Sequence, residues 1–203
     1  MATSKALTAV QLRRAGLGSF FRPVDLDSIG VTEPTLRRLV REGRVEKVAR
    51  GLYRLAAAPS SEHYTLAAVC ARIPRGVVCL LTALQVHGIG TRLSPEVWIA
   101  IPHGMRVPKA EIARLRVVRF SGHLMTAGVE AIRIDGVPIH ITSPARTVVD
   151  CFRLSRLIDR ETALEALREV LRARRTTPSA LLRVATACGS ASKLRTALEA
   201  LGA

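Results

Sequence analysis

One stretch of the sequence, residues 23–55, constrains the fold more than any other, because its glycines and prolines divide it into parts of defined length. Pro23 suits the first turn of a helix that we expect to run to about Ile29, because the N–H that proline lacks would have no acceptor there. Gly30 supplies a turn, and a second helix is predicted at 33–42. Two short helices with a tight turn between them predict a helix-turn-helix.

The second predicted helix has an apolar side and a basic side. Thr32 is the expected N-cap of this helix, and Gly43 is expected to end it. Leu36, Leu39 and Val40 share one face by the i, i+3, i+4 spacing, which favours burial of that face. The remaining surface of the helix then carries Pro34, Arg37, Arg38 and Arg41.

The residues after Gly43 alternate in the manner of a short antiparallel pair. Strands are expected at 44–48 and 52–55, with a glycine turn at 49–51 between them. A hairpin directly after a helix-turn-helix is typical of a winged helix, with the hairpin as its wing. Arg50 would lie at the tip of the wing with Lys47 nearby, whereas Tyr53 is expected to pack beneath it.

A helix with a buried apolar side and an arginine side can enter the major groove of DNA. Arginine there donates two hydrogen bonds to a guanine edge or neutralises phosphate, and Thr35 near the start of the helix can reach a phosphate or a base. The wing can contact the backbone or the minor groove beside the helix. The alternative is that these arginines form an ordinary solvated face, as most charge runs do.

The charge balance favours a polyanionic partner. The chain has 31 Lys and Arg against 16 Asp and Glu, a formal net charge of +15, and such a surface gains free energy from counterion release on nucleic acid. Only 4 of the basic residues are lysine, so a GC-rich coding bias can inflate the arginine total. The distribution of charge along the chain is therefore a better guide to a binding surface than the total. The density of positive charge is highest in the N-terminal quarter.

We predict three parts: a winged helix-turn-helix domain at 1–55, a linker at 56–62 and a mixed α+β domain at 63–203, so that the fold class is α+β. The linker is small, polar and proline-containing. Helices are expected at 8–15, 64–73, 143–154, 160–172, 178–187 and 191–201, and strands at 97–101, 116–120, 131–134 and 137–141. Residues 77–81 are either a buried strand or the start of a helix that runs to 86, because periodicity does not separate the two.

Features of an enzyme, a metal site or a membrane protein are missing from the sequence. There is no nucleophile elbow, no zinc-protease motif and no phosphate-binding glycine loop, so we expect neither catalysis nor a cofactor. The 4 cysteines have no C-x-x-C spacing, which favours buried thiols over metal binding. The carboxylates between 150 and 169 alternate with arginines, as on a salt-bridged surface. Without a membrane-length apolar run or a signal sequence, the chain is expected to be cytoplasmic.

Four segments in order carry a resemblance to a known family: GRVEKVARGLYRL (43–55), LTALQVHGI (81–89), VWIAIPHGMR (97–106) and ITSPARTVVDCFR (141–153). On these segments the chain resembles the AbiEi-type antitoxins of type IV toxin-antitoxin systems. The resemblance implies a winged-helix DNA-binding domain and a C-terminal antitoxin domain. It also implies repression of the chain's own operon at inverted repeats in double-stranded DNA. The DNA contacts would fall on Thr32, Thr35, Arg37, Arg38, Arg41, Arg44, Lys47 and Arg50.

The resemblance further implies antagonism of a nucleotidyltransferase-like toxin without a stable complex. An ordinary winged-helix regulator, with a C-terminal domain that senses a ligand or oligomerises, remains the alternative. The motif at 143–150 favours a structural role over a functional one: Ser143 as N-cap, Pro144 in the first turn, and Arg146 with Asp150 as an i, i+4 pair.

Overall fold

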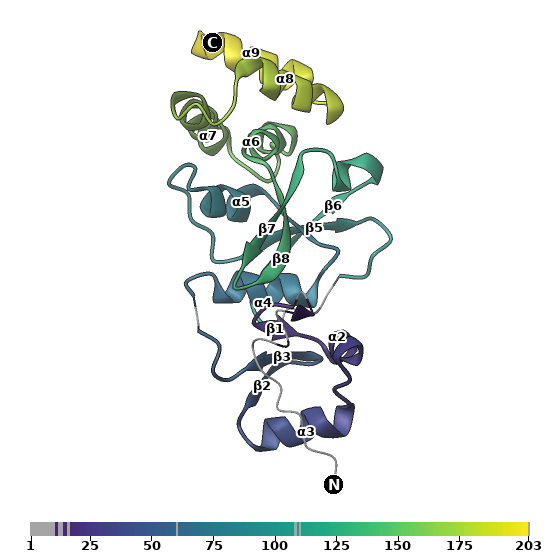
Figure 1. Ribbon diagram of the computed structural model, residues 1–203. Helices are drawn as coiled ribbons and strands as arrows, with labels where there is room; N and C mark the ends of the chain where they lie inside the picture. The colour runs from purple at the N-terminus through teal and green to yellow at the C-terminus, as the bar shows by residue number, and fades with distance from the viewer. Residues whose placement is uncertain are drawn as a thin grey trace. The chain divides into compact units, whose positions relative to one another are not determined.

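The chain divides into two compact units (Figure 1). The computed structural model describes residues 11, 14, 15, 17–59, 61–107, 109 and 111–202. The first unit comprises Met1–Pro74, Pro108–Ala113 and Ile132–Ile139, and the second comprises Arg75–Val107, Arg114–Ala131 and His140–Ala203. The helix predicted at 8–15 falls mostly on residues outside the described set.

The first unit contains a helix-turn-helix followed by a hairpin. Its elements are β1 (Phe20–Phe21), α2 (Pro23–Leu26), the 3-10 helix η1 (Asp27–Ile29), α3 (Glu33–Arg41), β2 (Val45–Ala49), β3 (Leu52–Leu55) and α4 (Tyr64–Arg72). The three strands pair antiparallel in the order β1-β3-β2. This arrangement confirms the predicted winged helix. Strand β1 was not predicted, because two consecutive phenylalanines give no alternation to follow.

A small apolar core fixes the helices of the first unit to its sheet. Its buried side chains are Phe21, Leu26, Leu36, Leu39, Val45 and Leu55. Helix α4 packs on the same sheet, where the Tyr64 ring meets the Phe20 ring edge-on at 5.0 Å and the Arg54 guanidinium lies 5.2 Å from the Tyr64 ring centre. The winged helix therefore includes contacts from beyond residue 55.

A second addition to this unit is the turn of a later hairpin. Asp135 (φ 51°) and Gly136 (φ 75°) form that turn with left-handed backbone at both positions, which suits a two-residue hairpin loop. The Ser19 N–H donates to the Asp135 carbonyl (2.9 Å), and the Ser61 hydroxyl donates to the Asp135 carboxylate (2.8 Å). The independence of residues 1–55 as a domain therefore stays a prediction.

The second unit combines a mixed sheet with a group of helices. Its elements are β4 (Val77–Val78), α5 (Leu80–His87), β5 (Val97–Pro102), β6 (Leu115–Phe120), the 3-10 helix η2 (Gly122–Met125), α6 (Pro144–Arg153), α7 (Arg160–Arg172), α8 (Pro178–Ala187) and α9 (Ala191–Leu201). Strands β7 (Val129–Ile134) and β8 (Val137–Thr142) also belong to its sheet, although their residues 132–134 and 137–139 group with the first unit. The five strands have the order β6-β5-β4-β8-β7, with β5 parallel to β6 and β4 parallel to β8. These elements confirm the α+β class. The undecided stretch at 77–86 is a short strand followed by a helix.

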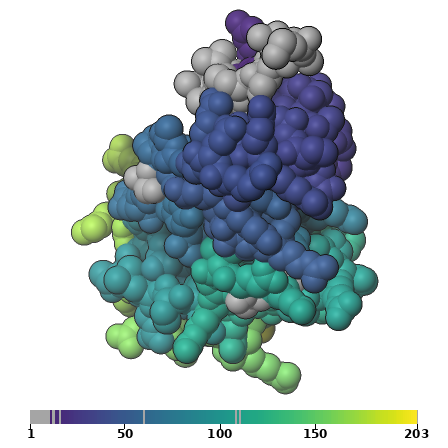
Figure 2. Space-filling model, turned by 90° about the horizontal axis from the view of Figure 1, so that it is seen from below, coloured from purple at the N-terminus to yellow at the C-terminus, as the bar shows by residue number. Residues whose placement is uncertain are grey.

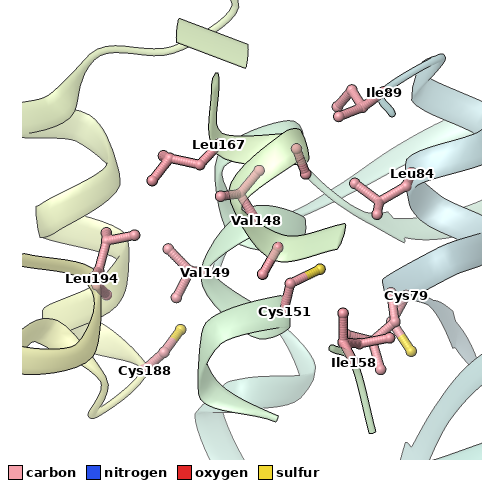
Figure 3. Close-up of a cluster of buried hydrophobic side chains, with 14 of the residues drawn as sticks. Cys79, Leu84, Ile89, Val148, Val149, Cys151, Ile158, Leu167, Cys188 and Leu194 are labelled. Atoms are coloured by element: carbon pink, nitrogen blue, oxygen red, sulfur yellow. The ribbon is translucent and has the colours of Figure 1, made fainter. Parts of the chain in front are cut away.

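Helix α6 forms the centre of the second unit's core. Figure 3 shows its residues Val148, Val149 and Cys151 between Leu84 and Ile89 on one side and Cys188 and Leu194 on the other. All four cysteines of the chain are buried and free, as predicted. Burial raises the pKa of Cys79 and Cys151 far above the usual thiol range. These thiols therefore serve as apolar core groups.

Candidate nucleic-acid interface

Helix α3 is held at both ends by local backbone features. Thr32 occupies the N-cap position with extended backbone, as predicted, but its side chain makes no capping hydrogen bond. Its hydroxyl lies 3.1 Å from the Thr35 hydroxyl instead. At the other end, Gly43 has a φ of 67°, its N–H donates to the Val40 carbonyl and the Arg44 N–H donates to the Leu39 carbonyl. This Schellman motif ends the helix where the glycine predicted.

The basic residues of α3 face outward to different degrees. Leu36 and Leu39 are 2% and 0% exposed, which turns the opposite side of the helix to solvent. Arg37 and Arg41 are exposed, whereas Arg38 is half-buried and its Nε lies 3.6 Å from the Glu42 carboxylate. Arg37 is bonded to Glu33 across one helical turn at 2.6 Å. Two of the arginines of α3 therefore lie beside carboxylates, those of Glu33 and Glu42, that were not among the predicted contacts.

The wing carries exposed basic side chains, and two aromatic rings of the protein pack beneath it. Lys47 on β2 and Arg50 at the turn are exposed, and Gly51 has the left-handed φ of 73° that the turn requires. Tyr53 on β3 is half-buried, and its ring stacks on Phe21 at a centroid distance of 6.5 Å. The prediction that Tyr53 packs beneath the wing is confirmed.

A groove of about 970 Å³ lies between α3 and the wing. Its lining combines apolar groups with three cations and one carboxylate: Pro23, Glu33, Pro34, Leu36, Arg37, Val40, Arg41, Lys47 and Tyr53. Figure 2 views the surface of this unit from the side of α3. Three of the eight predicted contact residues, Arg37, Arg41 and Lys47, thus line one groove. A smaller hollow of about 280 Å³ beside α2 includes Thr32.

The other predicted contact residues lie outside the large groove. Thr35, Arg38, Arg44 and Arg50 are not among its lining residues. Arg44 is exposed and lies 4.0 Å from the Glu42 carboxylate. Arg50 is at the tip of the wing, where its backbone N–H donates to the Glu111 carboxylate at 3.0 Å. Glu111 is absent from the predicted site because it lies 61 positions from Arg50, and no local sequence pattern relates the two.

The motif at 143–150 has the structural role that the sequence favoured. Ser143 caps α6 by accepting from the Arg146 N–H at 3.2 Å. Arg146 and Asp150 are both 0% exposed, and the Arg146 Nε donates to the Asp150 carboxylate at 2.9 Å. Arg153 donates to the other carboxylate oxygen at 2.8 Å, and both guanidiniums lie 5.1 Å from the Phe120 ring centre. The motif therefore forms a buried ionic network, more extensive than the predicted pair.

Several other polar residues of the second unit have structural partners. Glu169 accepts a hydrogen bond from the Gly90 N–H (2.6 Å), and Glu165 accepts from Thr91, so these carboxylates hold the loop after α5. His87 lies 2.7 Å from the Thr142 carbonyl. Within the described ranges, no three His, Cys, Asp or Glu side chains form a group that could hold a metal ion. In the part of the chain that the structure describes, no helix combines the length and apolar character that crossing a membrane requires.

A winged helix with a basic outer face, followed by an α+β unit, defines the class of winged-helix proteins with a second unit. Comparison with protein families identifies the family to which the chain belongs. Residues 9–56 match the family described as "Transcriptional regulator, AbiEi antitoxin", and residues 76–201 match the "AbiEi antitoxin C-terminal domain". The chain belongs to the AbiEi antitoxin family, which confirms the resemblance found in the sequence.

Similarity to solved structures concerns the fold. The chain is similar to the crystal structure of the RV2827C protein from Mycobacterium tuberculosis, with a TM-score of 0.50 and 15% sequence identity, over 94% of this chain and 80% of that one. At this identity the likeness says nothing about ligands. No curated protein matches the chain.

Proposed function

We propose that this transcriptional-regulator antitoxin represses its own operon by binding inverted repeats in double-stranded DNA through α3 and the β2–β3 wing. We further propose that it counteracts a nucleotidyltransferase-like toxin without a stable complex, and that it acts by binding and not by catalysis. Operator binding requires access to the chromosome, so the proposal also assigns the protein to the cytoplasm.

The observation that carries the DNA proposal is the shared groove of Arg37, Arg41 and Lys47. Three cations on two elements at one surface can neutralise neighbouring phosphates, and Arg50 extends the positive surface to the tip of the wing. Arg41 is exposed beside Pro34 on the side opposite Leu36 and Leu39, where a base edge could be reached. Thr32, Thr35, Arg38 and Arg44 are proposed as flanking contacts.

Fluorescence anisotropy with the DNA upstream of the chain's own reading frame tests this proposal. We expect Arg41→Ala to weaken binding by about 1–3 kcal/mol if Arg41 contacts a base, and to relax selectivity for the operator. Lys47→Ala should weaken binding to all sequences and lower the slope of affinity against salt by about one. Arg195→Ala, an exposed arginine on α9, is the matched control for net charge. Equal effects in all three variants would contradict the assigned surface.

The antitoxin proposal is tested by rescue. The full chain and the product of the neighbouring reading frame are expressed from separate inducible promoters, so that repression of the operon plays no part. Restored growth, without retention of the toxin on the tagged antitoxin, is the expected result. Growth that stays inhibited would favour the ordinary-regulator alternative.

A further inference from the structure

A carboxylate from a distant segment occupies the tip of the wing. The Arg50 N–H donates to Glu111 Oε2 at 3.0 Å, although the two residues are 61 positions apart. Glu111 belongs to Pro108–Ala113, which groups with the first unit, while the residues on both sides of this segment belong to the second. The contact is therefore a feature of the winged-helix unit that the hairpin sequence does not encode.

The position of this contact matters because wing-tip amides are suited to phosphate. The Arg50 N–H lies at the turn, just beyond the last paired residues, Ala49 and Leu52. Backbone N–H groups are among the common donors to DNA phosphates. A carboxylate oxygen and a phosphate oxygen are both anionic acceptors, so one replaces the other at a single N–H.

The negative charge of Glu111 also opposes the binding of phosphate at the wing tip. Among residues 97–120 it is the only acidic residue, and it bonds at the residue whose side chain is proposed to meet the DNA backbone. A negative charge beside a phosphate-binding surface lowers affinity through Coulomb repulsion. Both Glu111 and Arg50 are exposed, so water and salt screen the contact and DNA can displace it.

We infer that Glu111 is an intramolecular competitor of DNA phosphate at the wing tip, so that the winged helix binds its operator in exchange for this contact. The inference rests on the proposed DNA-binding function and adds a restraint on it. It makes the affinity of the protein for DNA lower than the basic surface alone would give.

Two substitutions separate competition from mere positioning of the wing. Glu111→Gln removes the charge but keeps an oxygen that can accept from the Arg50 N–H, and Glu111→Ala removes both. Competition predicts that Gln raises affinity for the upstream duplex by about threefold or more, the size of one screened charge contact, and that Ala raises it at least as much. The gain should shrink between about 50 and 300 mM salt.

The control is Glu199→Gln on α9, an exposed glutamate whose replacement changes the net charge equally. It should leave affinity unchanged. An unchanged Gln variant with a weaker Ala variant would show that Glu111 only positions the wing, and would overturn the inference. An equal gain in the control would also overturn it. If no variant binds the duplex, the DNA-binding proposal itself is refuted, and that result is distinct from unequal binding among variants.

Discussion

Replacing Asp150 with asparagine tests how strongly the buried ionic network holds the second unit together. The two carboxylate oxygens of Asp150 accept from Arg146 Nε (2.9 Å) and Arg153 Nε (2.8 Å). Arg146 is fully buried and also donates to the Leu124 carbonyl (3.3 Å) and the Ala127 carbonyl. Asparagine offers one oxygen and no charge. One guanidinium would then lose its acceptor, and Arg146 would remain buried without a counter-charge.

The expected cost follows from the burial of the three groups. Removing one partner of a buried ion pair destabilises a protein by about 3–5 kcal/mol, because the remaining charge stays out of water. The Arg153 side chain is 17% exposed, so solvent relieves part of its loss, whereas Arg146 at 0% receives no such relief. We therefore expect Asp150→Asn to lower the free energy of unfolding by about 3 kcal/mol or more.

Urea unfolding followed by tryptophan fluorescence measures this change. Trp98 is the only tryptophan of the chain, lies on β5 and is 5% exposed, so its emission reports on the second unit. Glu161→Gln, an exposed carboxylate on α7, is the control and should shift the unfolding free energy by less than about 0.5 kcal/mol. If Asp150→Asn does not fold, Arg153→Met removes one of the two charged hydrogen bonds and should cost about 1.5–3 kcal/mol. A loss below about 1 kcal/mol in the variant that folds would refute the reasoning.

Two further predictions concern a close backbone approach and a helix cap. In Gly18→Ala the new Cβ would lie 2.4 Å from the Gly136 carbonyl carbon, so the β7–β8 turn must shift. We expect this shift to lower the free energy of opening of the β1–β3 strand pair by about 1–3 kcal/mol, so that its amides exchange hydrogen faster. Gly104→Ala, which meets nothing within 4 Å, should leave exchange unchanged, and equal exchange in both would contradict the close approach. Hydrogen bonds from the Thr162 backbone and hydroxyl lower the pKa of Asp159, the N-cap of α7. This stabilisation is present at neutral pH and is lost as the pH falls through the lowered pKa. Asp159→Asn has no such charge, so its stability relative to wild type should rise only below about pH 4, and a difference constant from pH 7 to 2.5 would argue against the assignment.

The parts of the fold that the sequence predicts are those fixed by neighbouring residues. The i, i+3, i+4 spacing of Leu36, Leu39 and Val40 and the position of Gly43 determine α3, and the Asp135-Gly136 pair determines the β7–β8 hairpin. Contacts between distant segments leave no comparable pattern. The docking of Gly136 on Gly18 and the bond from Arg50 to Glu111 each join residues whose local sequence is compatible with many partners.

The candidate site shows the same division. Helical spacing places Arg37 and Arg41 one turn apart on one face, and the hairpin brings Lys47 to the same groove. The i, i+4 spacing of Glu33 and Arg37 also permits an ion pair, but spacing alone does not show that the pair forms. Arg38 was expected to point away from the core; it is half-buried instead, beside Glu42. Which basic side chains are already engaged depends on rotamers that a sequence does not reveal.

The pairing of the arginines predicts an order for their effects on DNA binding. Arg37 is bonded to Glu33 at 2.6 Å with both side chains exposed, a contact worth about 0–1 kcal/mol that must be exchanged for phosphate. Among the described residues no ion pair to Arg41 is present, so its guanidinium reaches DNA without that exchange.

Arg41→Ala should therefore weaken operator binding more than Arg37→Ala does. In the background of Glu33→Gln, which frees Arg37, the two alanine substitutions should become more nearly equal. Anisotropy titrations of the wild type, the three single variants and the two double variants give this comparison as two double-mutant cycles. An Arg37→Ala effect that does not change when Glu33 is replaced would mean that the pair opens before DNA arrives. The ranking would then have to come from the geometry of the groove alone.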